Sequence, residues 1–136
     1  MVVREWMTAP AIGVSPTTEA ISALERMTEL KFRRLPVHVD GSLVGIVTRS
    51  DLEAKLGWDR MTWRRLGRRV EDAMTPNPFT VSPEDKLEKA VELMLHHRIG
   101  GIPVVEDGKV VGMVTESDIF RAFVQVIAQV PETSAR

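Results

Sequence analysis

The sequence predicts a mixed α/β (α+β) fold built from two copies of one β-α-β-β-α unit. Residues 7–52 align with residues 74–119 at a constant offset of 67 positions, without a gap, and more than a third of the aligned pairs are identical. Each copy contains one amphipathic helical pattern and one strand-turn-strand pattern. Because a unit of this size rarely closes a core alone, we expect the copies to pack together and to form two related clefts.

The composition is that of a globular protein. The 136 residues are 43% hydrophobic and 27% charged, which suits one compact domain or two packed half-domains. No apolar run approaches the roughly 20 residues that span a bilayer, and no stretch near the N-terminus resembles a signal peptide, so we expect a cytoplasmic protein without a membrane segment. The absence of cysteine excludes disulfides and thiolate nucleophiles. A net charge of -1 gives no global attraction to nucleic acid.

A helix is predicted in each copy, over about residues 17–31 and 84–97. Apolar residues recur there at i, i+4 and i+7. Ser-Pro at residues 15–16 and 82–83 precedes each pattern. Serine is a favourable N-cap and proline suits the first helical position, so we expect the helices to begin at these pairs.

A β-hairpin follows in each copy. Asp-Gly at residues 40–41 and 107–108 separates two short apolar runs, which is typical of a tight hairpin turn. Each first strand begins near a proline, where a missing N–H is tolerated. A second helix is predicted to start directly after Thr48 and Thr115. Short extended pieces before each Ser-Pro complete the unit, at residues 12–14 and 79–81.

The pattern divides the chain into a first repeat, a linker, a second repeat and a frayed tail, at residues 1–56, 57–69, 70–130 and 131–136. The linker is basic, holds two of the three tryptophans, and has helical propensity from residue 59 to residue 66. Its tryptophans either pin the linker to its own core or form a protein-docking surface with the arginines. Nucleic-acid binding through the five arginines is less favoured because the rest of the chain is acidic.

The segment Gly-h-h-Thr-x-Ser-Asp, where h is apolar, occurs at residues 45–51 and 112–118. It places the end of a buried strand at the start of a helix, whose free N–H groups suit a phosphate. The aspartates, Asp51 and Asp118, are two-oxygen acceptors that suit a ribose diol. Thr-x-x-Asp at a helix start is also a capping box, and both roles are compatible in one residue.

A basic turn precedes the first hairpin strand of each copy, at residues 31–36 and 96–103. Cations at a helix C-terminus are favourable for the helix dipole alone, or they face an anionic ligand. Gly100-Gly101 either lets a flat ring approach the backbone or forms a loose turn. The adjacent histidines, His96 and His97, lack partners at metal-binding spacing, so no metal site is expected.

In this order, the segments resemble the cystathionine-β-synthase (CBS) domain. Both copies carry Met-Thr, Ser-Pro, h-Pro-Val, Asp-Gly and Gly-h-h-Thr-x-Ser-Asp, so the resemblance is to a tandem CBS pair, or Bateman module, expected here as a stand-alone protein. The resemblance implies two repeats that pack pseudo-symmetrically through their small sheets. It also implies a regulatory homodimer that binds AMP, ADP, ATP or S-adenosylmethionine between the repeats and signals to a partner protein. The chain lacks a phosphate-binding lysine loop and a nucleophile elbow, so we expect no catalytic residue and no catalytic cofactor. The alternative is a ligand-free interaction module.

The resemblance also implies two sets of ligand-binding residues, each mixing the repeats. The Asp51 cleft is expected to be the more open, because glycines stand where the Asp118 cleft has arginines. Its set is Ile46, Thr48, Asp51, Pro78, Phe79, His97, Arg98, Ile99, Gly100 and Gly101. The Asp118 set is Lys31, Phe32, Arg33, Arg34, Met113, Thr115 and Asp118.

Overall fold

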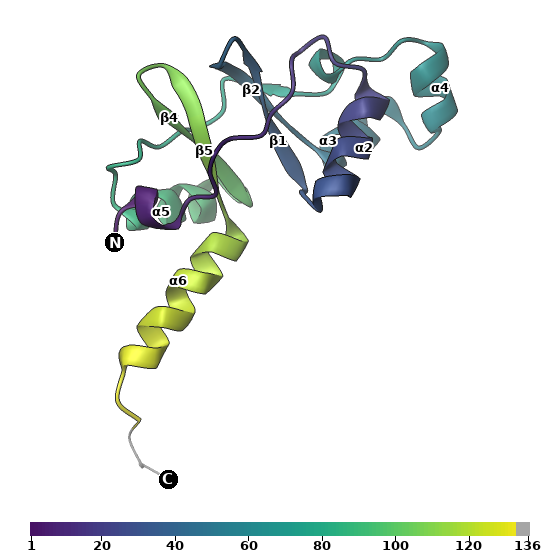
Figure 1. Ribbon diagram of the computed structural model, residues 1–136. Helices are drawn as coiled ribbons and strands as arrows, with labels where there is room; N and C mark the ends of the chain where they lie inside the picture. Colours follow the sequence, from purple (N-terminus) through teal and green to yellow (C-terminus); the bar gives the residue numbers. More distant parts are fainter. Residues whose placement is uncertain (133–136) are drawn as a thin grey trace.

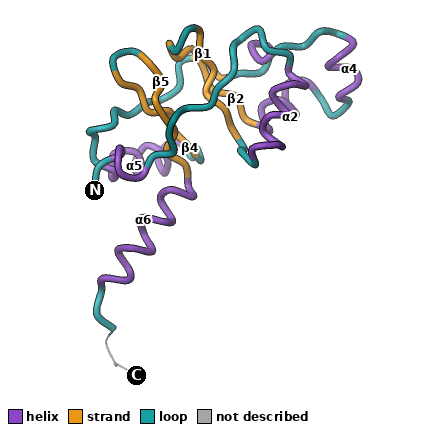
Figure 2. The backbone as a smooth tube through the Cα atoms, viewed as in Figure 1, coloured by secondary structure: helices purple, strands orange, loops and turns teal. Residues whose placement is uncertain are grey.

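A computed structural model describes residues 1–132, with helices at the two ends of the molecule and strands between them (Figures 1 and 2). The first repeat contains α2 (Ala20–Leu30), β1 (Arg34–Val39), β2 (Ser42–Thr48) and α3 (Arg49–Leu56). The second repeats the order with α5 (Leu87–His97), β4 (Gly101–Glu106), β5 (Lys109–Thr115) and α6 (Glu116–Gln129). The predicted fraying of residues 131–136 falls largely outside the described residues. No described helix has the length and apolarity needed to cross a membrane.

Both predicted hairpins are present. Asp40 and Gly41 join β1 to β2 with φ of 50° and 84°, and the equivalent turn joins β4 to β5. The sheet order is β1-β2-β5-β4, and the hairpins meet at their turns, where Ser42 pairs with Lys109. The Lys109 ammonium donates to Asp40 O at 2.8 Å across this junction. The predicted leading strands are isolated parallel bridges, from Val14 to Val37 and from Val81 to Val104.

The predicted helix starts are wrong by several residues. α2 and α5 begin at Ala20 and Leu87, after N-cap residues without a side-chain cap. Each Ser-Pro instead forms a turn ahead of the helix: Thr17 N–H donates to Ser15 Oγ at 3.1 Å, and Ser82 N–H donates to an Asp85 carboxylate oxygen at 2.8 Å. The side-chain acceptors satisfy this separate turn, so they are not available to cap the helix.

The first residues of each repeat cross to the other repeat. α1 (Val3–Trp6) packs on the second core, in which the Val3 side chain is fully buried. Thr8 then pairs with Met113 on β5 through two backbone hydrogen bonds of 2.8 and 3.0 Å. β3 (Thr75–Pro76), near the start of the second repeat, pairs with β2 of the first. The two cores therefore do not divide where the sequence repeats divide.

Glycines make both crossings possible. A Cβ atom on Gly112 would lie 2.7 Å from Thr8 O, and one on Gly45 would lie 2.9 Å from Thr75 O. A contact of a β-carbon with backbone at such distances is not tolerated without a shift of the chain. The repeated glycine of the Gly-h-h-Thr segment is thus a packing residue, used where a crossing strand lies directly on β2 or β5.

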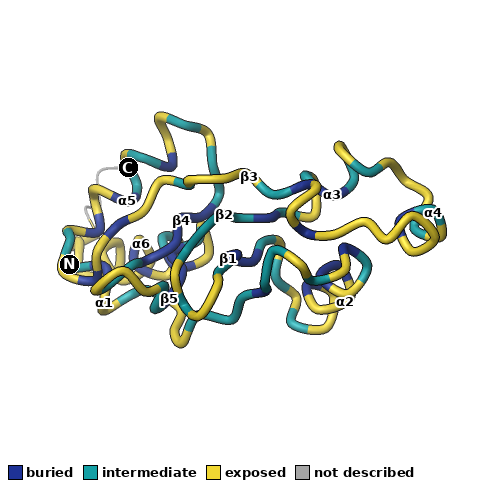
Figure 3. The backbone as a smooth tube through the Cα atoms, turned by 90° about the horizontal axis from the view of Figure 1, so that it is seen from above, coloured by how far each residue is buried: buried dark blue, intermediate teal, exposed yellow. Residues whose placement is uncertain are grey.

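The linker contains α4 (Arg60–Arg65), and the 3-10 helix η1 (Val70–Asp72) follows it; Trp63 of α4 and Val70 of η1 are buried in the core of the first repeat. α4 lies at the far end of the molecule from α6 (Figures 1 and 3). Trp63 is only 1% exposed, and its indole N–H donates to Leu56 O and Gly57 O at 3.0 and 3.1 Å. Trp58 is 75% exposed. One tryptophan therefore pins the linker to its core and the other remains on the surface.

Candidate functional site

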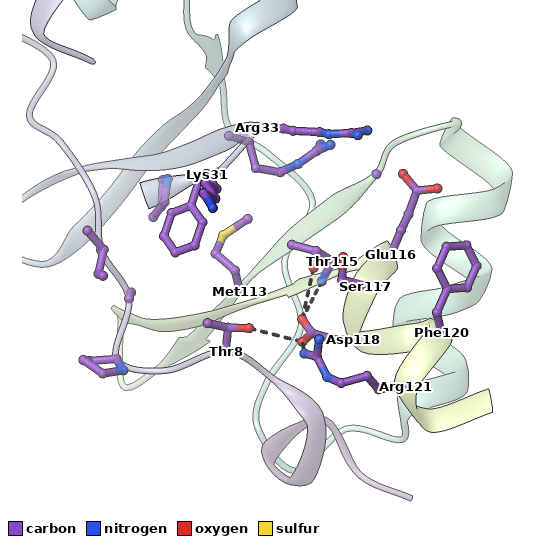
Figure 4. A pocket seen from close by; sticks show the side chains of 17 residues that line it. Thr8, Lys31, Arg33, Met113, Thr115, Glu116, Ser117, Asp118, Phe120 and Arg121 are labelled. Atoms are coloured by element: carbon purple, nitrogen blue, oxygen red, sulfur yellow. Dashed lines mark hydrogen bonds and ion pairs between the residues drawn. The ribbon is translucent and has the colours of Figure 1, made fainter. Parts of the chain in front are cut away.

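The clearest cavity has a volume of about 530 Å³ and lies between the repeats (Figure 4). One wall is the basic turn after α2 in the first repeat, and the opposite wall is the start of α6 in the second. The chain after α1 closes a third side, and Met113 of β5 lies between the walls. The lining residues are Thr8, Pro10, Ala11, Ile12, Lys31, Phe32, Arg33, Arg34, Pro36, Gly100, Met113, Thr115, Glu116, Ser117, Asp118, Phe120 and Arg121.

The wall from the first repeat owes its shape to the end of α2. Lys31 adopts a left-handed conformation with φ of 58°, and its N–H and that of Phe32 bond back to carbonyls of the last helical turn. This cap turns the chain sharply, so that the next side chains face the cavity. Arg33 O then accepts from Arg49 N–H at 3.1 Å, which ties the turn to the start of α3.

The opposite wall is centred on Asp118, which is fully buried. Its Oδ2 accepts from Thr115 N–H at 2.9 Å and from Thr115 Oγ1 at 3.3 Å. Its Oδ1 accepts from Thr8 Oγ1 at 3.1 Å and also pairs with the Arg121 guanidinium (Figure 4). The crossing segment and α6 therefore hold this carboxylate in a fixed orientation at the cavity surface.

Asp51 has the simpler capping-box environment that the Thr-x-x-Asp pattern predicts. Its N–H donates to Thr48 Oγ1 at 2.9 Å, and its carboxylate accepts from Thr48 N–H at 3.0 Å. The residue three positions on is Ala54, where the second copy has Arg121. The two copies thus share the cap and differ in whether a cation covers the aspartate.

Arg34 extends from the first repeat to the backbone of the second. A Cβ atom on Gly100 would lie 2.5 Å from the Arg34 guanidinium, and one on Gly101 would lie 2.7 Å from its Cδ. Burial lowers the pKa of the Arg34 side chain below its usual value, an effect that the nearby Glu116 carboxylate opposes. Gly100-Gly101 therefore admits an arginine against its backbone, where the sequence suggested room for a flat ring.

The structure brings the whole Asp118 set together. All seven of its predicted residues line the cavity. The cleft that the sequence ranked second therefore has a well-formed cavity.

The Asp51 set is more dispersed. Gly100 lines the Asp118 cavity, and it also lines a separate apolar hollow of about 340 Å³ between α5 and α6, together with Arg98 and Ile99. Phe79 stacks on His97 with ring centroids 3.8 Å apart, so two residues expected to contact a ligand contact each other. Ile46, Thr48 and Asp51 are half-buried at the end of β2 and the start of α3, Gly101 is buried, and Pro78 is half-buried before Phe79.

Several lining residues were missed from the sequence. Applying the offset of 67 to Pro78 and Phe79 would have found Ala11 and Ile12. Thr8 belongs to a segment whose crossing has no sequence signature, and Arg121 has no counterpart in the first repeat. Among the described residues, no group of three or more His, Asp or Glu side chains is arranged to hold a metal ion.

The family model of the CBS domain matches residues 3–56 and 70–125. The chain belongs to the CBS domain family. This CBS pair is 31% identical to a CBS domain-containing protein of Dictyostelium discoideum, over 98% of this chain and 99% of that one. It is 32% identical to an uncharacterised protein of Methanocaldococcus jannaschii, of which it spans only 47%.

Solved structures confirm the CBS-pair fold. The crystal structure of CBSX2 in complex with AMP has a TM-score of 0.81 and 33% identity, covering 92% of this chain and 97% of that one. The CBS domain pair of protein MJ0100, in complex with 5′-methylthioadenosine and S-adenosyl-L-methionine, has a TM-score of 0.80 and 27% identity, covering 93% and 98%.

Proposed function

We propose that this CBS pair is a non-catalytic regulatory module that binds an adenosine-containing nucleotide in the Asp118 cavity and signals its presence to a partner protein. The observation that carries the proposal is the cavity itself. It gathers residues of both repeats around a buried aspartate at a helix start, so an occupant would contact both halves at once.

The chemistry of the cavity supports a nucleotide. Its volume lies within the range of small-molecule sites. Asp118 is a carboxylate acceptor of the type that suits a ribose diol once one of its present donors is replaced, and Phe32 and Met113 offer apolar contact to a base. The AMP complex of CBSX2 and the S-adenosylmethionine complex of MJ0100 show that similar CBS pairs bind such compounds.

Isothermal titration calorimetry with AMP, ADP, ATP and S-adenosylmethionine tests the proposal. We expect at least one compound to bind the wild type and to lose most of its affinity for Asp118→Asn, which keeps the side-chain size but removes the charge. Asp51→Asn is the matched control, because the same change is made at the equivalent position outside the cavity. Absence of binding by every compound, or equal losses in both variants, would contradict the assignment.

We also propose that the module is a homodimer through α6. This helix projects from the body (Figure 1) and exposes Phe120, Phe123, Val124 and Ile127 at the spacing of a single helical stripe. Sedimentation velocity should show a dimer for the wild type and a monomer for Phe123→Glu. Gln125→Glu adds the same charge away from the stripe and should remain dimeric.

A protein-docking surface on the linker is a second candidate function. Trp58 and Met61 are 75% and 72% exposed beside several arginines, although Trp63 already anchors the segment. Arg60, Arg64 and Arg69 each pair with a glutamate, which leaves little free charge for nucleic acid. Once the regulated protein is known, Trp58→Ala should abolish its binding and leave nucleotide affinity unchanged. Unchanged partner binding would rule this surface out.

A further inference from the structure

The Asp118 cavity has an excess of positive charge. Four cationic side chains line it, and only two carboxylates, those of Glu116 and Asp118, oppose them. Lys31, Arg33 and Arg34 form no ion pair with any residue between positions 1 and 132, although Glu116 is close enough to influence Arg34. Cations gathered in a hollow without carboxylate partners favour an occupant with several negative charges.

Asp118 has no free acceptor capacity for such an occupant. Its two oxygens already receive four donors, two from Thr115, one from Thr8 and one from Arg121. A carboxylate has about four lone-pair sites, so a ribose hydroxyl must replace one of these donors.

Arg121 is the donor that can leave. Its side chain is 60% exposed and extends from the surface of α6, whereas the other donors are a backbone N–H and two short hydroxyl side chains in the cavity wall. Ala54 occupies the equivalent position in the first repeat, so the Thr-x-x-Asp cap forms without this arginine. The cap therefore does not depend on the pair between Arg121 and Asp118.

We propose that the cavity selects a nucleotide with two or more phosphates, and that binding exchanges ion-pair partners. A ribose hydroxyl replaces Arg121 as the hydrogen-bond donor to Asp118, and a phosphate forms an ion pair with the released Arg121. This inference rests on the proposed function and specifies its ligand. Arg121 lies on the Asp118 side of the cavity, and Arg33 and Lys31 lie on the opposite wall (Figure 4), so one phosphate group faces each wall.

The exchange explains how the site discriminates among adenosine compounds. Adenosine would have to displace Arg121 from Asp118, and because adenosine has no phosphate, the guanidinium would be left without an anionic partner. S-adenosylmethionine carries a sulfonium and an ammonium against one carboxylate, so its net positive charge is repelled by the lining cations. One phosphate satisfies the guanidinium that is released from Asp118, and a second phosphate is needed to reach the cations of the opposite wall as well.

Calorimetric titration of adenosine, AMP, ADP and S-adenosylmethionine into the wild type and Arg121→Ala tests the inference. For the wild type, we expect ADP to bind about tenfold or more tightly than adenosine, since hydrogen bonds to charged groups contribute at that level. S-adenosylmethionine should bind most weakly. In Arg121→Ala the two effects should have opposite signs: adenosine binds as tightly as before or more tightly, and ADP binds about tenfold more weakly.

Further variants test the phosphate contacts and provide a control. Arg34→Ala should weaken ADP and leave adenosine unchanged, and Arg33→Ala serves the same purpose should the first fail to fold. Lys55→Ala removes an exposed cation from the last turn of α3, outside this cavity, and should change neither ligand. The affinity for ADP should also fall with added salt, whereas that for adenosine should not.

The outcomes separate the two proposals. If adenosine and ADP bind the wild type equally, or if Arg121→Ala weakens both by the same factor, the partner exchange is wrong and the nucleotide site stands. If AMP binds as tightly as ADP, or if S-adenosylmethionine binds more tightly than ADP, the charge selection is wrong. If no adenosine compound binds, both the exchange and the proposed function fail.

Discussion

Trp63 is the residue whose removal should most weaken attachment of the linker to the first repeat. Its indole is 1% exposed in the first core, and its N–H reaches two carbonyl groups at the end of α3. Truncation of a buried tryptophan to alanine costs about 3–5 kcal/mol through lost burial and the cavity left behind. For a chain of this length, that corresponds to a fall of about 10–17 °C in the unfolding temperature.

Thermal and urea unfolding followed by circular dichroism would measure this loss. Trp58→Ala is the matched control, because Trp58 is in the same segment but mostly exposed, and surface changes stay within about 0.5 kcal/mol. Trp63→Phe should retain most of the apolar burial and lose about 1 kcal/mol with the indole hydrogen bonds. The reasoning is refuted if Trp63→Ala unfolds at the wild-type temperature, or if Trp58→Ala is equally destabilised.

Three further predictions concern the crossing segments and the Ser-Pro turn. Gly112→Ala should lower the free energy of unfolding by about 2 kcal/mol or more, because its Cβ atom would displace Thr8 and two backbone hydrogen bonds; a wild-type urea midpoint would show that the segment does not pack on β5. Val3→Ala should cost about 2 kcal/mol, because Val3 is fully buried in the second core; no change would mean that α1 is not docked. The hydrogen bond from the Ser82 N–H, and then the Lys89 ammonium, lower the pKa of Asp85 below its usual value of 3.8. The ionised Asp85 therefore stabilises the fold above pH 3.8, and this stabilisation is lost as the pH falls through the lower pKa of the folded state. Urea midpoints of Asp85→Asn and wild type should therefore differ at pH 6 and converge in strong acid, and a difference independent of pH would exclude the titration of Asp85 as its cause.

The local parts of the fold were predictable because local chemistry determines them. Asp-Gly places two residues at positive φ and so fixes each hairpin turn, and Thr-x-x-Asp fixes the start of α3 and of α6. The Ser-Pro pairs misled because serine and proline satisfy an isolated turn as well as a helix cap. Only the hydrogen bonds formed within the turn distinguish these two cases.

The candidate site was predictable where the repeat itself carried the information. Lys31, Phe32, Arg33 and Arg34 follow from the basic turn, and Asp118 follows from the motif. Arg121 and Thr8 could not be predicted, because one is a difference between the copies and the other arrives by a long-range crossing. The relative openness of the clefts was also misjudged, since it depends on where the Arg34 side chain lies against Gly100 and on the stacking of Phe79 with His97.

The crossing of the two leading segments has a consequence for how such a molecule could arise and be divided. A single repeat on its own would present a β5-type strand without its crossing partner, and a second identical copy could supply that partner by reciprocal domain swapping. Joining the copies in one chain makes the exchange intramolecular, with an effective concentration set by the linker. If the chain is cut between Gly57 and Gly67, the two halves should therefore reassemble, because the first residues of each half pack on the strands of the other.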